Sequence, residues 1–245
     1  MQIPIRSVGP AAAFLFLVQG LKLLNAPGLR RYVWFPILIN VVLYSAGFWL
    51  ASRYFTAAMH WLVPAWLDWL RWLLWPLFAL LLLATAFFTF TLMTNLLGSP
   101  LYGRLTEQVR RLQASGQIAA PGSEHSALAS LFSESRRLGY FALRALPLLA
   151  LFLIPLINVI APFLWMLFGA WSLSLDYMAY PLEARGLLFK EQRDVVRKRR
   201  LDMLAFGGAV MLGLAIPLLN IFIPPAAVIG ATLYILEAER RGEAL

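Results

Sequence analysis

Residues 72–103 read WLLWPLFALLLLATAFFTFTLMTNLLGSPLYG and contain no charged side chain. A bilayer core of about 30 Å needs about 20 apolar helical residues to cross it. This stretch therefore predicts a membrane-spanning helix over residues 72–100. A second uncharged stretch predicts an earlier span over residues 32–53. The composition agrees, with 61% hydrophobic and only 13% charged residues, so we predict an all-α integral membrane protein.

Residues 145–175 and 203–236 are also uncharged, but proline interrupts both. At ~1.5 Å per residue either stretch is too long for one simple crossing, and two crossings need roughly 40 residues. Proline ends or kinks a helix because it lacks a backbone donor and clashes with the preceding turn. We therefore predict two re-entrant, hemi-penetrating helical hairpins. Two proline-kinked, tilted spans are the alternative.

A short repeat lies near the middle of both late stretches. Residues 154–162 read IPLINVIAP and residues 216–224 read IPLLNIFIP. Paired, proline-interrupted apolar segments are typical of transport sites at membrane depth. Asn158 and Asn220 are thus candidates to line the path, although satisfying the backbone groups of a turn is the alternative role for both.

The basic residues decide the predicted topology. With two spans and two hairpins, 19 of the 21 Lys and Arg residues lie on one side, and only Arg53 and Arg71 lie on the other. Cytoplasmic loops carry an excess of Lys and Arg, so both termini are predicted to be cytoplasmic. An inverted or dual orientation is the alternative. The remaining parts of this single membrane domain, residues 1–245, are an N-terminal interfacial helix (7–26), cytoplasmic helices with a loop (101–144) and a basic linker (176–202).

Composition also excludes several classes of function. The chain has no cysteine, and His60 and His125 lie far apart in sequence, so we expect no metal and no cofactor. The net charge of +9 suits anionic lipids and small anions. Its basic residues flank apolar helices, which argues against nucleic-acid binding. No phosphate-binding loop and no catalytic constellation is present, so we expect neither an enzyme nor an ATP-driven pump. The uncharged stretches hold no carboxylate, which favours a passive, channel-like path over proton coupling.

Three segments have distinctive sequences. Residues 27–40 read PGLRRYVWFPILIN, residues 99–109 read SPLYGRLTEQV, and YPLE at 180–183 is followed by FKEQR at 189–193. Together they resemble the CysZ family of bacterial sulfate permeases. The family's acidic residue before Tyr-Pro is replaced by Ala179 in this chain. The resemblance implies sulfate uptake across the inner membrane for sulfate assimilation and cysteine biosynthesis. It also implies a homo-oligomer with two long spans and membrane-dipping hairpins.

The first candidate site comprises Gly28, Leu29, Arg30 and Arg31. Free N–H groups and the dipole at a helix N-terminus favour an anion, and glycine permits its close approach. The two arginines add planar donors that match an oxyanion and stay charged. We predict that these residues bind sulfate. Two arginines that snorkel at the interface are the alternative.

The second candidate cluster contains Arg104, Glu107, Arg110 and Arg111, and spacings of three and four place Glu107 beside all three arginines on a helix. Arg104, Glu107 and Arg110 are the candidates for a role in the pore. A carboxylate among arginines would gate or tune an anion path by competing for the same donors. An exposed ladder of intrahelical ion pairs is the alternative. The expected partners are sulfate, membrane lipids and further copies of the chain. A transporter of thiosulfate, molybdate or chloride and a non-transporting, membrane-shaping scaffold are the rival functions.

Overall fold

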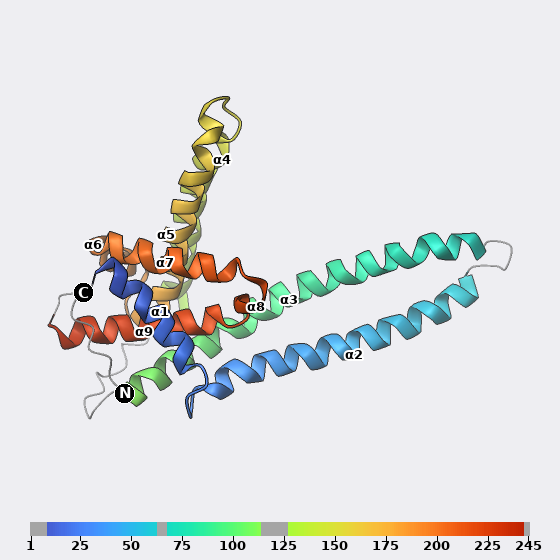
Figure 1. Cartoon of the computed structure of the whole chain (residues 1–245), viewed down its shortest axis with the longest axis horizontal. Helices are drawn as coiled ribbons and strands as arrows, with labels where there is room; N and C mark the ends of the chain where they lie inside the picture. The colour runs from blue at the N-terminus through green and yellow to red at the C-terminus, as the bar shows by residue number, and fades with distance from the viewer. Residues whose placement is uncertain (1–8, 63–67, 114–126, 243–245) are drawn as a thin grey trace. The chain divides into compact units, whose positions relative to one another are not determined.

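The computed structural model describes residues 9–62, 68–113 and 127–242, and this part of the chain is entirely helical (Figure 1). The predicted all-α class is therefore confirmed. The predicted loop and His125 lie outside the described residues, as do residues 7 and 8 of the predicted first helix. The helices are α1 (Pro10–Leu23), α2 (Arg30–Leu62), α3 (Asp68–Gln113), α4 (Ala127–Leu151), the 3-10 turn η2 (Ile157–Val159), α5 (Ala161–Glu183), α6 (Phe189–Lys198), α7 (Arg200–Leu214), α8 (Pro217–Asn220) and α9 (Ile223–Arg240).

Among the described residues, no helix combines the length and the apolar composition that crossing a membrane requires. The two spans and the membrane-dipping hairpins thus stay predictions. The helix boundaries themselves differ from the predicted segments. Helix α2 covers residues 32–53 and continues to Leu62, and α3 continues from residue 100 to Gln113 without a break.

The chain divides into two compact units, and each is described separately. The second unit, Arg31–Leu101, is the antiparallel hairpin of α2 and most of α3 (Figure 1). The ring of Phe55 on α2 stacks on Phe78 of α3 with centroids 3.8 Å apart and meets Trp75 edge-on at 5.0 Å. Stacked and edge-to-face aromatic contacts add to the energy of apolar burial, so this cluster ties the two helices together.

The first unit comprises the residues up to Arg30 and those from Tyr102 onward. Its core is formed by α1, α5, α7 and α9. A Cβ at Gly20 of α1 would collide with the carbonyl of Ala226 on α9, and a Cβ at Gly230 would meet that of Phe16. Glycine lets these two backbones touch, which brings the large core side chains into contact. The largest fully buried side chains include Tyr234, Phe206, Leu105, Met178 and Ile229.

The N-terminal helix α1 has two distinct faces. Ala13 and Phe16 are buried against the core, whereas Phe14 and Leu15 are about half exposed, at 49% and 46%. Proline at the first turn favours helix initiation there because its missing N–H has no partner in a helix N-terminus. One face of α1 thus packs against the core of the first unit, and a second, apolar face is exposed.

Both copies of the repeat lie at the turn of a helical hairpin. The first lies between α4 and α5 and the second between α7 and α9. The backbone N–H of Asn158 donates to the carbonyl of Ile154 at 3.0 Å, and the N–H of Asn220 donates to that of Ile216 at 2.9 Å. The following bonds also match, from Ile160 to Ile157 at 2.9 Å and from Phe222 to Leu219 at 2.8 Å.

The prolines that end the two copies occupy equivalent places. Pro162 and Pro224 both lie in the first turn of the returning helix, where proline is favoured. Pro147 behaves differently, because α4 continues through it and ends at Leu151. The two copies therefore share these backbone hydrogen bonds and the proline that starts the returning helix. Their conformations differ in between, since the first forms the 3-10 turn η2 after Leu156 at a φ of +71° and the second forms the short helix α8.

Candidate anion site

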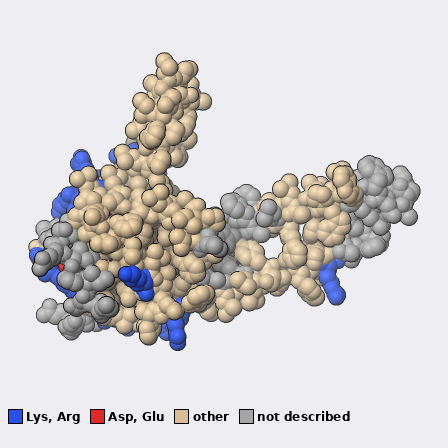
Figure 2. All heavy atoms as spheres, in the orientation of Figure 1, with Lys and Arg blue, Asp and Glu red and all other residues tan. Residues whose placement is uncertain are grey.

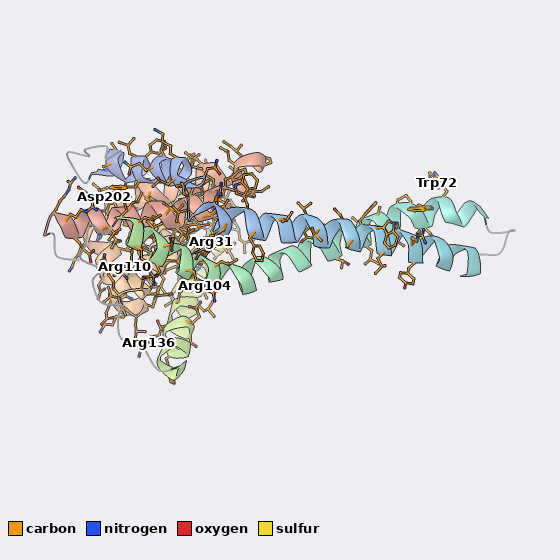
Figure 3. All side chains as sticks on the ribbon, turned by 90° about the horizontal axis from the view of Figure 1, so that it is seen from below. Arg31, Trp72, Arg104, Arg110, Arg136 and Asp202 are labelled. Carbon is orange, nitrogen blue, oxygen red and sulfur yellow. The ribbon has the colours of Figure 1, made fainter. Side chains whose placement is uncertain are left out.

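Arg110 is the most buried of the charged residues predicted for the site, with 4% of its surface exposed. It lies on the last turns of α3, where Leu105 and Val109 are buried and fix the helix to the core (Figure 3). Its Nη1 donates to the carbonyl oxygen of Ala184 at 3.2 Å and lies 3.8 Å from Oε2 of Glu107. The charge of Arg110 is thus held inside the first unit by a backbone carbonyl and a carboxylate.

Glu107 is shared between two arginines, as the helical spacing predicted. Its Oε1 accepts a 3.0 Å hydrogen bond from Nε of Arg111, and its side chain is 37% exposed. Arg104, one turn earlier, is exposed. The contact with Arg111 alone would be an exposed ladder of little energetic weight. The contact with buried Arg110 is different, because there the carboxylate of Glu107 lies near a positive charge that water does not freely screen.

Gly28 lies against the helix that carries the second predicted cluster. It has a φ of +91°, in the region that favours glycine, and a Cβ there would lie 3.2 Å from Nε2 of Gln108. Gln108 is the neighbour of Glu107 on α3. The segment before α2 therefore packs directly on the helix that carries the second cluster, a proximity that the sequence did not predict.

The backbone N–H groups near Gly28 are partly occupied. Those of Leu29 and Arg30 both donate to the carbonyl oxygen of Ala26, at 3.0 and 3.2 Å. Leu29 is 1% exposed and anchors the segment, while the side chain of Arg30 is exposed. In the second unit Arg31 is exposed, and its Nη2 donates to the hydroxyl of Tyr32 at 3.0 Å. An anion bound here would contact guanidinium groups, since the N–H groups of Leu29 and Arg30 already donate to Ala26.

Sequence reasoning missed Arg185, which it counted only as a topological charge. Nη2 of Arg185 lies 2.5 Å from Oε2 of Glu239 on α9, and its side chain is 11% exposed. Its Nε and Nη1 atoms are buried and find no hydrogen-bond partner among the described residues. Burial lowers the pKa of Arg185 to about 10; Glu239 opposes the shift, and the charge of Arg110 adds to it. The charges of the buried Arg110 and Arg185 thus interact, and two donors of Arg185 have no acceptor among the described residues.

A third arginine holds α4 to α5. Arg137 donates to Oδ1 of Asp176 at 2.5 Å and lies 3.9 Å from Oε2 of Glu134. Partial burial raises the pKa of Asp176, and Arg137 opposes this shift. Asp176 lies one helical turn before Ala179, which is 2% exposed. Position 179 thus carries no carboxylate, but Asp176 provides one on the preceding turn.

The other two predicted pore residues lie elsewhere in the first unit. Asn158 is in η2 and Asn220 ends α8, and both are exposed at the hairpin turns. Their backbone N–H groups close these turns.

The guanidinium of Arg185 is buried, and two of its donors find no partner among the described residues. Such a group can bind an anion. In the comparison with known proteins, the family described as Sulfate transporter CysZ/Etoposide-induced protein 2.4 matches residues 16–225. The chain belongs to this family, so the resemblance identified in the sequence is confirmed. A transporter acts at a membrane, and the family therefore places the chain among membrane transport proteins and not among enzymes.

Individual relatives agree along most of their length. A sulfate transporter CysZ of Pseudomonas fluorescens (strain Pf0-1) is 39% identical over 227 residues, covering 89% of this chain and 90% of the relative. The protein of the same name from Pseudomonas aeruginosa (strain PAO1) is 38% identical over 229 residues, covering 89% and 92%. That of Pseudomonas syringae pv. tomato is 38% identical over 238 residues, covering 94% and 93%.

Proposed function

We propose that this chain is a sulfate permease that takes up sulfate across the bacterial inner membrane for sulfate assimilation and cysteine biosynthesis. Family membership and the names of its relatives support the substrate. The observation that carries the proposal is the buried guanidinium of Arg185, with two unpartnered donors, beside the charge of Arg110.

The proposed anion station, which is formed by Arg110 and Arg185, suits a doubly charged oxyanion. Guanidinium groups present planar, paired donors that match its oxygens, and burial strengthens the attraction. Permeation also requires release, so binding must stay moderate. Glu239, 2.5 Å from Arg185, and Glu107, 3.8 Å from Arg110, compete with the anion for the same donors. This competition makes occupancy reversible.

Capture is proposed to begin at Gly28, Leu29, Arg30 and Arg31. The backbone of Gly28 lies against Gln108, next to Glu107 on α3, so the start of the entry segment contacts the helix that carries Arg110. The exposed guanidinium of Arg30 would meet the anion first, and buried Leu29 would hold the segment in place. Arg104, exposed one turn before Glu107, adds a charge to the same route. Asn158 and Asn220 remain candidate polar contacts at the hairpin turns.

The membrane arrangement is proposed from charge and local structure. Residues 32–53 and 72–100 would span the bilayer, and residues 145–175 and 203–236 would dip into it and return. The backbone hydrogen bonds that the two hairpin turns share support a common placement. The described turn of the first hairpin is apolar and exposed, with Leu153 at 84% and Leu156 at 89%. The interfacial helix (7–26) and both termini would lie on the cytoplasmic side, where the basic residues gather.

A homo-oligomer follows from this arrangement. Two spans enclose no aqueous path, and half-depth hairpins leave backbone groups that need protein cover in a lipid environment. Neighbouring copies would provide it. A purified monomer that still transports sulfate would contradict this part of the proposal.

The test is uptake of radiolabelled sulfate into proteoliposomes. Arg185→Gln and Arg110→Gln are expected to lose most of the saturable flux, and the double variant Arg30→Ala/Arg31→Ala to raise the sulfate concentration needed for half-maximal uptake. Arg136→Gln is the matched control, since it removes an exposed charge of the same kind on α4 (Figure 3). Size-exclusion chromatography must show that each variant folds and assembles.

Two outcomes would favour the rival functions. Competition by thiosulfate, molybdate or chloride with equal strength would define a general anion transporter, because arginine donors recognise oxyanions broadly. Uptake at the level of empty vesicles from intact wild-type protein would make the membrane-shaping scaffold the leading explanation.

A further inference from the structure

A pocket of about 550 Å³ lies apart from Arg110 and Arg185, where four helices of the first unit converge. Each helix contributes one face at helical spacing, such as Tyr140, Arg144 and Leu148 on α4. Its volume is within the usual range of small-molecule sites. The lining consists of Tyr140, Arg144, Leu148, Leu164, Leu167, Phe168, Trp171, Arg193, Arg197, Arg200 and Leu204.

One part of this pocket is strongly cationic. Four arginines line it, and none of the described lining residues is acidic. Arg193 lies 3.5 Å from Oδ1 of Asp194, its neighbour in sequence, and Arg200 donates through Nε to the carbonyl oxygen of Arg197 at 3.2 Å. An ion pair between partly exposed, adjacent residues compensates little charge. Four guanidinium groups of like charge thus surround a space that suits an anion.

The tyrosine of the pocket orients part of this charge. The guanidinium of Arg144 lies 3.6 Å from the centre of the Tyr140 ring, and that of Arg193 lies 5.7 Å from it. The Tyr140 hydroxyl accepts a 2.9 Å hydrogen bond from Nε1 of Trp171. Cation–π contacts hold the two arginines over a ring that is itself fixed. The ring face is therefore used by arginine and is not open for stacking by an aromatic ligand.

The remainder of the lining is apolar and partly open. Leu164 and Leu167 of α5 are 37% and 57% exposed, and Leu148, Phe168 and Leu204 complete this wall. Arg144 and Leu148 are one turn apart on α4, about 6 Å along its axis. The lining therefore changes from cationic to apolar along α4, toward the turn of the hairpin. In Figure 2 the end of this hairpin carries no charged side chain on the visible face, and basic side chains gather near α6.

We propose that this pocket binds one anionic phospholipid, with its phosphate among the four arginines and the start of an acyl chain on the leucine wall. A free small anion would leave the exposed leucines in water, so it explains only half of the lining. A neutral apolar molecule would leave four arginines without a counter-charge. An amphiphile with a negative head satisfies both halves, because apolar burial and charge attraction then act together. This site rests on the proposed membrane location and is independent of sulfate transport.

The test measures binding to the full-length protein in a neutral detergent. Phosphatidylglycerol is titrated, and the melting temperature and the native mass spectrum are followed. We expect a rise in melting temperature and one retained lipid per chain. Phosphatidylcholine, sodium phosphate and sodium sulfate at the same concentrations should produce neither effect. Arg193→Gln/Arg197→Gln should bind phosphatidylglycerol about 30-fold more weakly, since the two arginines contribute about equally to the free energy of binding an anionic lipid.

The matched control also removes two positive charges but leaves the pocket intact. Lys190→Gln/Arg136→Gln changes exposed residues outside the lining and should retain the wild-type response. Equal responses to phosphatidylglycerol and phosphatidylcholine would overturn the proposal, as would a response to free phosphate or sulfate, which would indicate a small-anion site. Unchanged binding by the pocket variant would also overturn it. If that variant does not fold, Arg197→Gln alone, on an exposed position, provides the same test. Loss of sulfate flux with lipid binding intact would leave this inference standing.

Discussion

Nη1 of Arg110 donates a 3.2 Å hydrogen bond to the carbonyl oxygen of Ala184, which lies 74 residues away in sequence and directly precedes Arg185. This bond joins the end of α3 to the segment after α5. It brings a residue that the sequence singled out next to one that it did not. Both guanidinium groups are buried, and each has a carboxylate partner from a helix, Glu107 and Glu239. The proposed anion station is built on this pair.

Glu239→Gln should strengthen sulfate binding. The carboxylate lies 2.5 Å from Arg185, so its removal frees a buried guanidinium for the anion. We expect the sulfate concentration for half-maximal uptake to fall by about tenfold, equivalent to about 1.4 kcal/mol. The maximal rate should fall as well, because release becomes slower. Uptake kinetics in proteoliposomes measure both quantities. An unchanged half-maximal concentration would show that Glu239 and sulfate do not compete.

Gly28→Ala should destabilise the protein and weaken capture. A φ of +91° is strained for an L-residue, by roughly 1–2 kcal/mol, and the new Cβ would press on Gln108. We expect a lower melting temperature and a higher half-maximal sulfate concentration. Gly139→Ala on α4 is the control, since a Cβ there meets nothing within 4 Å and helical Gly→Ala typically gains roughly 0.5–1 kcal/mol. Equal melting temperatures for the two variants would contradict the assigned backbone conformation.

Two adjacent glycines of α7 should respond oppositely to alanine. A Cβ at Gly207 would collide with the backbone carbonyl of Ala170 on α5, whereas a Cβ at Gly208 meets nothing within 4 Å. Overpacking a core contact costs typically about 1–3 kcal/mol. Gly207→Ala should therefore lower the melting temperature, and Gly208→Ala should leave it unchanged or raise it. A reversed order would show that α5 and α7 do not pack as described.

Asp176 should make stability depend on pH. Partial burial raises the pKa of this carboxyl above its ordinary value of 3.8, against the pull of Arg137. Between the ordinary pKa of the unfolded state and the raised pKa of the folded state, the folded protein binds more protons than the unfolded chain. The free energy of unfolding therefore falls as pH rises through this window. The pKa of Glu183 is raised as well, also by burial, and acts in the same direction. Asp176→Asn should therefore reduce this decline without abolishing it.

Melting temperatures measured from pH 4 to pH 7 test this dependence. The variant loses the ion pair with Arg137, so its absolute stability is compared with its own value at the lowest pH. A wild-type protein whose stability rises through the window would reverse the inferred direction of the Asp176 pKa shift.

Single cysteines can test the proposed hairpins, because the chain contains none of its own. Leu156→Cys at the turn of the first hairpin should resist a membrane-impermeant maleimide added to either side of proteoliposomes. Leu201→Cys, also highly exposed at 70% but in the basic linker, should react from the cytoplasmic side. Reaction of position 156 from the outer side would show that this stretch crosses the membrane fully.

Local sequence determined several features that the structure retains. The helical class follows from long apolar segments, and the two hairpin turns follow from the repeat, since Pro162 and Pro224 both start a helix and Asn158 and Asn220 close the same backbone bond. The contact of Glu107 with Arg110 and Arg111 follows from helical spacing alone. These features depend on neighbours within a few residues, which a sequence displays directly.

Only the tertiary structure decided where the charges meet. Nothing in the spacing of Arg110, Ala184 and Glu239 predicts that three distant segments converge, because the packing of α3, α5 and α9 sets these distances. The same holds for Gly28 against Gln108, and for the four arginines that share a pocket with the leucines of α4 and α5. Burial, which turns an ordinary arginine into a group with unpartnered donors, is a property of the packed unit and not of any one segment.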